Sequence, residues 1–388
     1  MNTNPPRKRD FLPFLLVLGS LGLAFFTGFM ARVWIGGPSL RYPLLEQVIR
    51  LIQDNGLNDL PPRLPLEYGL IRGFLQAYND PYTVFLEPPQ AELQNDQLEG
   101  RYGGIGARLE RDAQGNVLLY PYPDSPAARA GILEGSRLLH VDSLAIDPGM
   151  DLSDVEAALR GPVGQQVSLT VDQTPDHSPQ EFTVTRAEVS QPSTTWNLAA
   201  AGPRVGVIHV NVLAATTPQE IQSAVADLRK RGADHFILDL RGNGGGLVEA
   251  GVDTARLFLT EGTIIQQQYR GKPIETFQVE KPGPLADLPI VVLVDKDTAS
   301  AAEIVAGALQ VHRRALLVGQ PTHGKDTIQL VFDLKDGSSL HVTAARWWIP
   351  GLDPPIRDGH GLQPDIPIPT DADSDGAWLN AAMEVLIQ

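Results

Sequence analysis

The chain carries four successive patterns of apolar and polar positions. Residues 11–31 form an uninterrupted apolar run, and residues 40–80 place apolar positions at helical spacing in two segments separated by a proline-rich break. Between about 97 and 187, short alternating runs separated by glycine-containing turns predict a β-rich module with two short helices. From about 196 strands and helices alternate, which predicts an α/β core with parallel strand pairing.

The end of this core shows strand patterns without helices between them. Three such runs occupy residues 314–320, 327–334 and 338–349. Because only short connections separate them, we expect them to pair as antiparallel hairpins. The segment 197–203, NLAAAGP, is expected to be a linker.

The apolar run near the N-terminus is long enough to cross a membrane. Its twenty-one residues carry no charge, and a bilayer core of ~30 Å needs about 20 residues. Arg7, Lys8 and Arg9 precede the run, and positive residues favour the cytoplasmic side. We therefore expect a single-pass anchor with the body of the chain outside the cytoplasm, on the periplasmic or extracellular side. A cleaved signal peptide, which would leave the body secreted, is the alternative.

Composition narrows the function classes. The 388 residues suffice for two or three domains, and a net charge of −15 with a pI near 4.9 argues against nucleic-acid binding. The chain has no cysteine, which excludes disulfides and cysteine-bound metals. The acidic stretch 371–376 begins like a calcium loop, but Ala382 stands where such a loop needs glutamate. We expect no metal and no cofactor.

Two glycine-rich segments place backbone N–H groups where they could bind an anion. RYGGIGARL (101–109) could form a nest for a peptide carboxylate beside an edge strand, and a plain hairpin turn is the alternative. DLRGNGGG (239–246) ends a strand and enters a helix, so its N–H groups could stabilise an oxyanion. A tight strand–helix turn is the alternative for this second segment.

Ser300 stands where the apolar strand 289–295 gives way to a helix, so it is either a helix cap or a nucleophile. No histidine obviously serves as its base, although His323 lies in a loop with a glycine. Lys325 enters an apolar strand from that loop and could be buried with a lowered pKa, or it could be a solvated loop residue. Gln329 lies four residues later, on the same strand face, where it could orient the lysine.

Taken together these residues resemble the carboxy-terminal processing (tail-specific) proteases. The motifs DPYTVFL (80–86), DLRGNGGG, TASAAEI (298–304), GKDTIQ (324–329) and RWWIPG…GHGLQPDIPI (346–368) occur in that family's order, over about residues 40–370. The segment from GGIG onward is similar to a PDZ domain of the bacterial protease type. It departs from that pattern at Ser136, where the family has aspartate, and we expect this to affect a turn rather than the ligand groove.

The resemblance implies an α/β multidomain fold and a role for each motif. The domains would be the N-terminal tail and anchor, a helical region, the PDZ domain and the protease core, at 1–37, 38–96, 97–187 and 188–388. In a serine endopeptidase of this type Ser300 attacks the scissile carbonyl, Lys325 accepts its proton and Gln329 positions Lys325. The oxyanion hole would be formed by the backbone N–H of Ala301 and by that of either Gly245 or Gly246, between which the sequence does not decide. The PDZ carboxylate loop would be Gly103, Gly104, Ile105 and Gly106, with an apolar pocket completed near Val155 to Leu159.

The expected partners are protein substrates with exposed apolar C-termini, and a homodimer through residues 40–80. Two other functions stay open. The chain could be an inactive PDZ-bearing adaptor that binds C-termini without cleaving them, although an adaptor has no need for Ser300, Lys325 and Gln329 together. It could also be an esterase with His323 as its base, in which case Lys325 would be dispensable.

Overall fold

The computed structural model describes residues 42–173, 178–199, 202–369 and 375–387, and it divides at Ile71 into two compact units. The apolar run 11–31, on which the prediction of a membrane anchor rests, lies outside the described residues. Within the described ranges, no helix has the length and the apolar character that a membrane crossing requires.

The N-terminal part is helical. It contains α2 (Pro43–Asn55), α3 (Arg63–Tyr78), the short strand β1 (Val84–Leu86) and α4 (Pro88–Glu99). Four apolar residues of α2 recur at helical spacing and are exposed, namely Leu44, Val48, Leu51 and Ile52, whereas Leu45 and Ile49 are half-buried. The helix α4 was not predicted, because its polar sequence has little apolar periodicity. Two prolines at its start and Gly100 in the left-handed conformation at its end set its limits.

The β-rich module has a sheet of strand order β3-β4-β5-β7-β8, with β6 paired to β5, and a separate β2–β9 pair. In this sheet β3 is an edge strand. Alternate residues of the strands, such as Val167, Leu169 and Val171 on β7, fill a core of their own. The bounds are β2 (Arg101–Gly104), β3 (Ala107–Arg111), β4 (Val117–Pro121), α5 (Pro126–Arg129), β5 (Ser136–Val141), β6 (Leu144–Ala145), α6 (Leu152–Leu159), β7 (Gln166–Asp172), β8 (Pro179–Thr185) and β9 (Ala187–Ser190).

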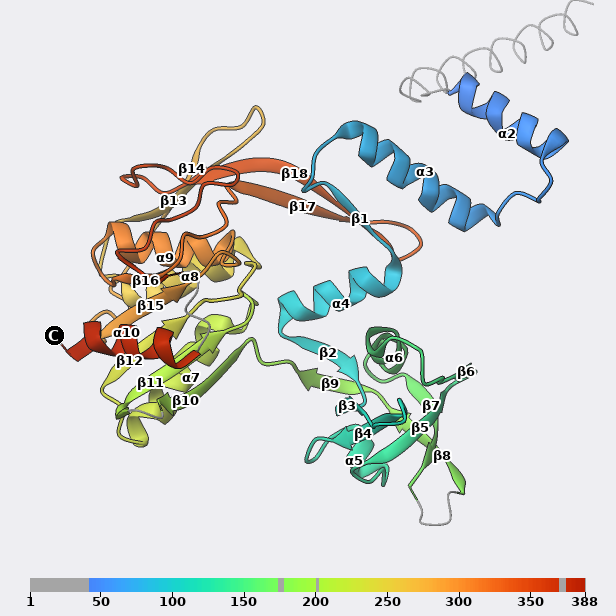
Figure 1. The fold of residues 1–388 in the computed structure, drawn as a ribbon, viewed down its shortest axis with the longest axis horizontal. Helices are drawn as coiled ribbons and strands as arrows, with labels where there is room; N and C mark the ends of the chain where they lie inside the picture. Colours follow the sequence, from blue (N-terminus) through green and yellow to red (C-terminus); the bar gives the residue numbers. More distant parts are fainter. Residues whose placement is uncertain (1–41, 174–177, 200–201, 370–374, 388) are drawn as a thin grey trace, which may run out of the picture. The chain divides into compact units, whose positions relative to one another are not determined.

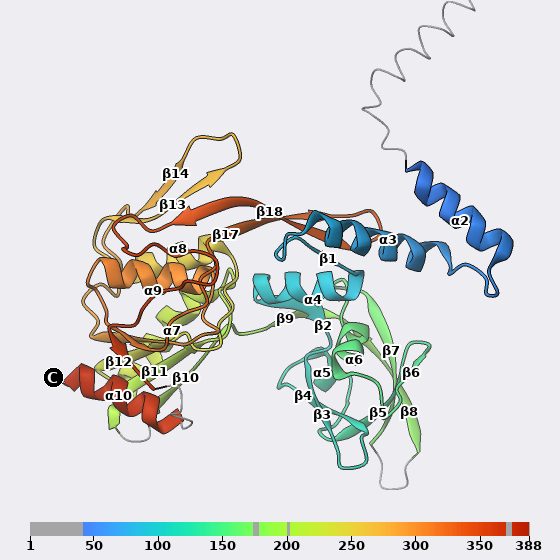
Figure 2. The ribbon, with the colours of Figure 1, turned by 45° about the horizontal axis from the view of Figure 1, so that its top comes forward.

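The α/β core is built on a sheet of order β10-β11-β12-β15-β16-β19, parallel except for the β10–β11 pair. One face packs on α7, α8 and α9 and the other on α10 (Figures 1 and 2). The bounds are β10 (Thr194–Ala199), β11 (Gly202–Val210), α7 (Thr217–Lys230), β12 (His235–Asp239), α8 (Val248–Phe258), β15 (Ile290–Val294), α9 (Ala301–Val311), β16 (Leu317–Gly319), β19 (Ile366–Pro367) and α10 (Asp375–Ile387).

A second sheet, of order β1-β18-β13-β14 with β17 paired to β18, lies over α8 and α9 in Figure 1. Its strands are β13 (Thr263–Tyr269), β14 (Glu275–Gln278), β17 (Thr327–Asp333) and β18 (Ser339–Trp348). The predicted hairpin of 327–334 with 338–349 is therefore present. The expectation that 314–320 joins it was wrong, because β16 is buried and pairs in parallel with β15 across the α9 crossover.

The expectation of a linker at 197–203 was also wrong for its described ends. Residues 197–199 belong to β10 and residues 202–203 to β11, and the two strands pair antiparallel.

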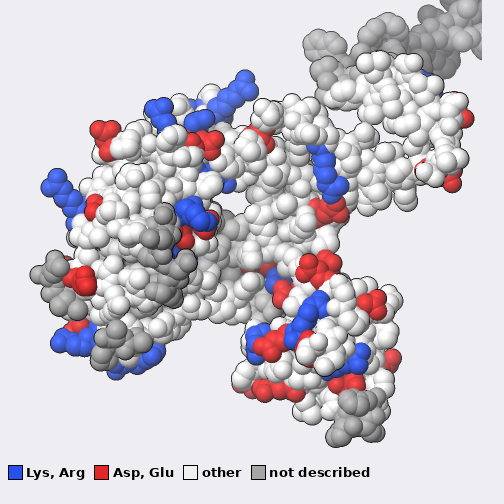
Figure 3. Space-filling view, viewed as in Figure 1, with Lys and Arg blue, Asp and Glu red and all other residues white. Residues whose placement is uncertain are grey.

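On the face seen in Figure 3, basic and acidic side chains are intermixed, without a broad basic area.

Candidate active site

Ser300 immediately precedes α9, after the buried strand β15. Its backbone has φ 53° and ψ −118°, a left-handed conformation that is unusual for a residue other than glycine. Such a conformation costs about 1–3 kcal/mol and persists only where surrounding contacts impose it. A strained turn between a strand and a helix presents a serine hydroxyl at the end of a sheet, as a nucleophile requires.

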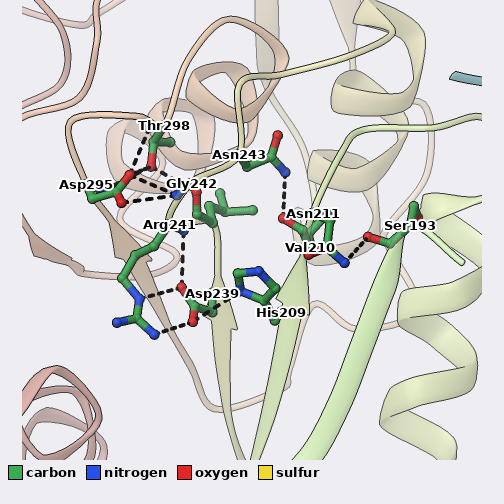
Figure 4. Close-up of polar contacts among 11 residues, drawn as sticks. Ser193, His209, Val210, Asn211, Asp239, Arg241, Gly242, Asn243, Asp295 and Thr298 are labelled. Atoms are coloured by element: carbon green, nitrogen blue, oxygen red, sulfur yellow. Dashed lines mark hydrogen bonds and ion pairs between the residues drawn. The ribbon is translucent and has the colours of Figure 1, made fainter. Parts of the chain in front are cut away.

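The loop before Ser300 is fixed by the carboxylate of Asp295 (Figure 4). Asp295 accepts hydrogen bonds from the N–H of Gly242, at 3.0 Å, and from the N–H and hydroxyl of Thr298, each at 3.0 Å. The Thr298 hydroxyl also lies 2.9 Å from the carbonyl of Leu240. The loop of Ser300 and the glycine-rich loop are thereby held against each other.

Glu303 connects the nucleophile to the lysine loop. Its carboxylate is fully buried, and it accepts hydrogen bonds from the Ser300 N–H (2.8 Å), the Thr322 hydroxyl (2.5 Å), the Gly324 N–H (2.8 Å) and the Lys325 N–H (2.9 Å). A buried carboxylate is tolerated only when its oxygens are satisfied in this way. Glu303 was not predicted as a site residue, although its place three residues after a helix cap is the pattern of a capping box.

Lys325 precedes β17, and its Nζ lies 3.1 Å from Oε1 of Gln329. The two residues are thus brought together, with Lys325 lying before the strand and not on it. Burial lowers the pKa of Lys325 below its ordinary value, and the negative charge of Asp80 opposes that effect. The neighbour of Nζ is a neutral amide, so an uncharged amine is tolerated here.

Ser300, Lys325 and Gln329 all line one cavity of about 300 Å³. Its wall also contains apolar side chains from the start of α8 and from β17, of which Leu330 and Val331 are exposed to solvent. They are Leu247, Val248, Ile328, Leu330 and Val331.

In the glycine-rich loop, one backbone N–H group is hydrogen-bonded within the loop and two other glycines line the cavity. The N–H of Gly245 donates to Oδ1 of Asn243 at 2.9 Å, and Asn243 is itself buried and bonded to the carbonyl of Val210 (Figure 4). Gly244 and Gly246 line the cavity. A side chain at Gly245 would meet Ala299 and Ser300 at 2.9 Å, so only glycine fits there.

The histidines lie in different settings. His323 is exposed and is not among the residues that line the cavity. His341 does line it; it is buried, with Nε2 3.1 Å from the hydroxyl of Ser339. Burial, and then the positive charge of Lys325, lower the pKa of His341. His341 was not predicted as a site residue. The alternating pattern of a strand indicates which face a residue lies on, but not which side chains it meets there.

On the opposite face of the sheet, His209, Asp239 and Arg241 form a second polar cluster (Figure 4). Asp239 is buried, with Oδ2 2.6 Å from the Arg241 guanidinium and 3.3 Å from Nδ1 of His209. The hydrogen bond with Asp239 raises the pKa of His209, against the effect of burial. This cluster fixes the strand ends from which the glycine-rich loop leaves.

A separate cavity of about 500 Å³ lies in the β-rich module. Its lining combines the first strands with α6 and includes Ile105, Arg108, Glu156, Leu159 and Arg160. Gly106, with φ 69°, is buried beside Ser125, and Gly103 accepts a hydrogen bond from Gly161 at 3.0 Å. Val155, which was expected near this pocket, belongs instead to the module's core.

In the described ranges, no group of three or more histidine or acidic side chains is placed to hold a metal ion.

Comparisons with known proteins agree on one family. The model of peptidase family S41 matches residues 204–368, and that of the PDZ domain matches residues 117–173. The carboxyl-terminal-processing protease of Picosynechococcus sp. is 37% identical over 310 residues, 78% of this chain and 73% of the relative. The carboxy-terminal processing protease CtpA of Bacillus subtilis is 32% identical over 298 residues, 74% of this chain and 63% of the relative. The solved photosystem II D1 C-terminal processing protease is 31% identical with a TM-score of 0.45, over 87% of this chain and 90% of that one.

Proposed function

This chain belongs to the carboxyl-terminal-processing serine peptidases of family S41, and from that premise we propose that it cleaves proteins near their C-termini with Ser300 as nucleophile and Lys325 as general base. The observation that carries the proposal is the contact of Lys325 with Gln329, at 3.1 Å, in the cavity that Ser300 also lines. A buried lysine next to a neutral amide can be uncharged at neutral pH, and only an uncharged amine can accept a proton.

The reaction follows from this arrangement. Ser300 Oγ attacks the scissile carbonyl carbon, and its proton passes to the amine of Lys325. The backbone N–H groups of Ala301 and Gly246 stabilise the oxyanion, each worth about 3 kcal/mol. The Lys325 ammonium then gives its proton to the leaving amine, and the acyl-enzyme forms. The neutral Lys325 then takes a proton from a water molecule, whose oxygen attacks the ester carbonyl, and the resulting Lys325 ammonium protonates Ser300 Oγ as the ester bond breaks.

The PDZ domain would select the substrate by its tail. The strand β3 has a free edge beside α6, so an extended peptide can add to the sheet there. Gly103, Gly104, Ile105 and Gly106 would hold its terminal carboxylate by their N–H groups. The apolar side chains of Ile105 and Leu159 favour an apolar C-terminal residue.

The proposed location is the outer side of a cell membrane, with residues 11–31 as the anchor. It rests on the uncharged run and the preceding basic cluster. Fractionation of cells that express the full chain, followed by protease treatment of intact spheroplasts, tests it. The body should pellet with membranes and be digested from outside. A soluble body of lower mass would instead support a cleaved signal peptide.

Dimerisation through residues 40–80 is a further part of the proposal. The exposed apolar stripe of α2 is the kind of surface that a second copy would cover. Light scattering on residues 38–388 should give twice the mass of one chain, and Val48→Glu with Leu51→Glu should halve that value. A single-chain mass for the unmodified protein would refute dimerisation.

Cleavage by residues 38–388 of an unfolded protein with a free apolar C-terminus tests the chemistry. Ser300→Ala and Lys325→Ala should each abolish cleavage, whereas His323→Ala should retain it. Loss of activity in His323→Ala with retention in Lys325→Ala would indicate the histidine-dependent esterase mechanism. Tight binding of C-terminal peptides without cleavage would indicate the adaptor.

A further inference from the structure

Tyr82 lies directly against the lysine, from a segment far away in the sequence. Its ring centroid is 4.9 Å from Lys325 Nζ. Its carbonyl accepts a hydrogen bond from Nε2 of Gln329, and its hydroxyl donates to Oδ1 of Asp358 at 2.5 Å. Tyr82 therefore contacts Lys325, contacts Gln329, which orients Lys325, and is hydrogen-bonded to the loop of Asp358.

The contact with Gln329 decides which end of the amide faces the lysine. A glutamine amide has one donating and one accepting end. Because Nε2 donates to the carbonyl of Tyr82, Oε1 is directed to Lys325 Nζ. A neutral amine that donates one hydrogen to Oε1 keeps its lone pair free for the proton of Ser300.

The contact with Asp358 ties Tyr82 to the turn of Lys325. In the loop of Asp358, the Gly359 N–H donates to the carbonyl of Gly324 at 3.0 Å. Gly324 immediately precedes Lys325, and a side chain at Gly324 would lie 2.4 Å from the backbone nitrogen of His360. The Tyr82 hydroxyl is thus attached to a loop that is closely packed on the lysine's own turn.

The segment of Tyr82 is itself held in place. The Asp80 carboxylate accepts hydrogen bonds from the Thr83 hydroxyl (2.6 Å) and the Tyr82 N–H (3.1 Å), and the Thr343 N–H donates to Thr83 Oγ1 at 3.1 Å. The following residues pair with β18 as β1. These contacts fix the backbone carbonyl to which Gln329 is bonded.

We propose that Tyr82 is a positioning residue for the general base: its carbonyl orients Gln329, and its ring, fastened through Asp358, covers the Lys325 amine and keeps water from it. The inference rests on the proposed Ser300–Lys325 mechanism and adds to it a residue that touches neither the scissile bond nor Ser300.

The titratable and charged groups around Lys325 set the sign of the expected effect. They are Asp80, Glu303, Asp326 and His341, together with Tyr82 itself, whose pKa the hydrogen bond with Asp358 and burial raise to about 12. Removal of the ring admits water to Nζ and so favours the ammonium. The lost contact with the ring face acts the other way, but burial is the larger effect on this lysine.

The test compares Tyr82→Ala, Tyr82→Phe and Asp358→Ala by kcat, KM and the pH dependence of kcat on the same unfolded substrate. Tyr82→Ala should move the acidic limb of kcat upward by about one pH unit, which is an approximately tenfold loss below the limb, with recovery on the alkaline side. Tyr82→Phe keeps the ring and loses only the Asp358 bond. We expect a loss of about two- to threefold, matched by Asp358→Ala, which removes the acceptor, and not deepened in the double variant.

Tyr78→Phe is the matched control, because Tyr78 is exposed and ends α3 outside the site; its kcat should be unchanged. A uniform loss of kcat at every pH in Tyr82→Ala, or a change confined to KM or Tm, would overturn the positioning role. The proposed function fails separately: it falls if Lys325→Ala keeps both activity and the acidic limb, whatever the Tyr82 variants do.

Discussion

The cavity lined by Ser300 and Lys325 and the cavity of the PDZ domain differ in how firmly their polar groups are held. Beside the first cavity, the buried carboxylate of Glu303 accepts hydrogen bonds from the backbone N–H groups of Ser300 and Lys325, and the Lys325 amine donates to the amide of Gln329. In the PDZ cavity the polar lining of Arg108 and Glu156 is exposed to solvent. Bond cleavage requires atoms fixed in advance, whereas capture of a flexible tail tolerates adjustable side chains.

The cations of the two cavities differ as well. Arg160 borders the PDZ cavity, with its guanidinium 2.9 Å from the Asp96 carboxylate and 4.2 Å from the Tyr102 ring. Lys325 has a neutral hydrogen-bond partner, and burial lowers its pKa. A lysine can lose its charge in such a place and an arginine cannot, which supports the proposal that proton transfer takes place in the first cavity.

The sharpest way to break this comparison is Lys325→Arg. The guanidinium keeps the positive charge and cannot accept a proton, so kcat should fall by about 10³-fold or more, without recovery up to pH 10. Lys296→Arg is the control: Lys296 is exposed and paired with Asp297, and its kcat should be unchanged. Activity of Lys325→Arg within tenfold of the unmodified enzyme would show that Lys325 is not the base.

Glu303→Gln tests whether catalysis requires the Glu303 carboxylate to hold the backbone of Ser300 and Lys325 in place. The new amide group directs hydrogens at backbone N–H donors, and each buried donor left unpaired costs about 1–3 kcal/mol. We expect a lower Tm and a kcat reduced about 10- to 100-fold where the protein remains folded. Glu220→Gln is matched, since Glu220 accepts the Thr194 N–H at 2.9 Å away from the site; it should lower Tm and spare kcat. Equal kcat losses in both variants would contradict the role of Glu303.

Arg108→Glu tests whether the cavity of the PDZ domain binds C-terminal peptides. Arg108 is exposed on β3, so stability should change by less than about 1 kcal/mol. Binding of C-terminal peptides with acidic residues should weaken by about three- to tenfold and binding of basic ones should strengthen, by fluorescence anisotropy. The kcat for a short peptide without a matching tail should not change. Arg129→Glu, in the same module and outside the cavity, should alter none of these, and unaltered peptide selectivity in Arg108→Glu would count against this cavity.

The smallest expected effect concerns His209, on the other face of the sheet. Its pKa is raised in the folded protein by the hydrogen bond with Asp239, so its stabilising contribution is present below its ordinary pKa of 6.5 and is lost as the pH rises through the folded value. His209→Ala should therefore lower Tm more at pH 5.5 than at pH 8.5. A Tm difference that is independent of pH would show that the imidazole adds no charge-dependent stability.

Local patterns made much of this fold predictable. Periodicity located α2, α3 and the strand–helix order around Ser300, and the contact between Lys325 and Gln329 joins residues only four apart. The strand β16 was assigned to the wrong pairing, because an apolar run of three buried residues does not reveal its partners. The helix α4 was not predicted, because its sequence shows little amphipathic periodicity.

The unpredicted parts of the site depend on contacts between distant residues. Gln329 and Tyr82 are 247 positions apart, and the local sequence of neither segment indicates that the two residues are in contact. Glu303 lies close to Ser300 in the sequence, but its bonds to Gly324 and Lys325 require the folded loop. Periodicity reports which face of an element is buried, and it does not report which polar groups meet there.

The most direct test is the pKa of Lys325, measured by NMR on the Ser300→Ala protein with ¹³Cε-labelled lysine. The chain has few lysines, and the resonance absent from Ser300→Ala/Lys325→Ala identifies the one at issue. We predict that this resonance titrates below 10.5, the ordinary value for a lysine side chain. A Lys325 resonance that titrates with the exposed lysines would contradict the claim that this residue is the neutral base of the enzyme.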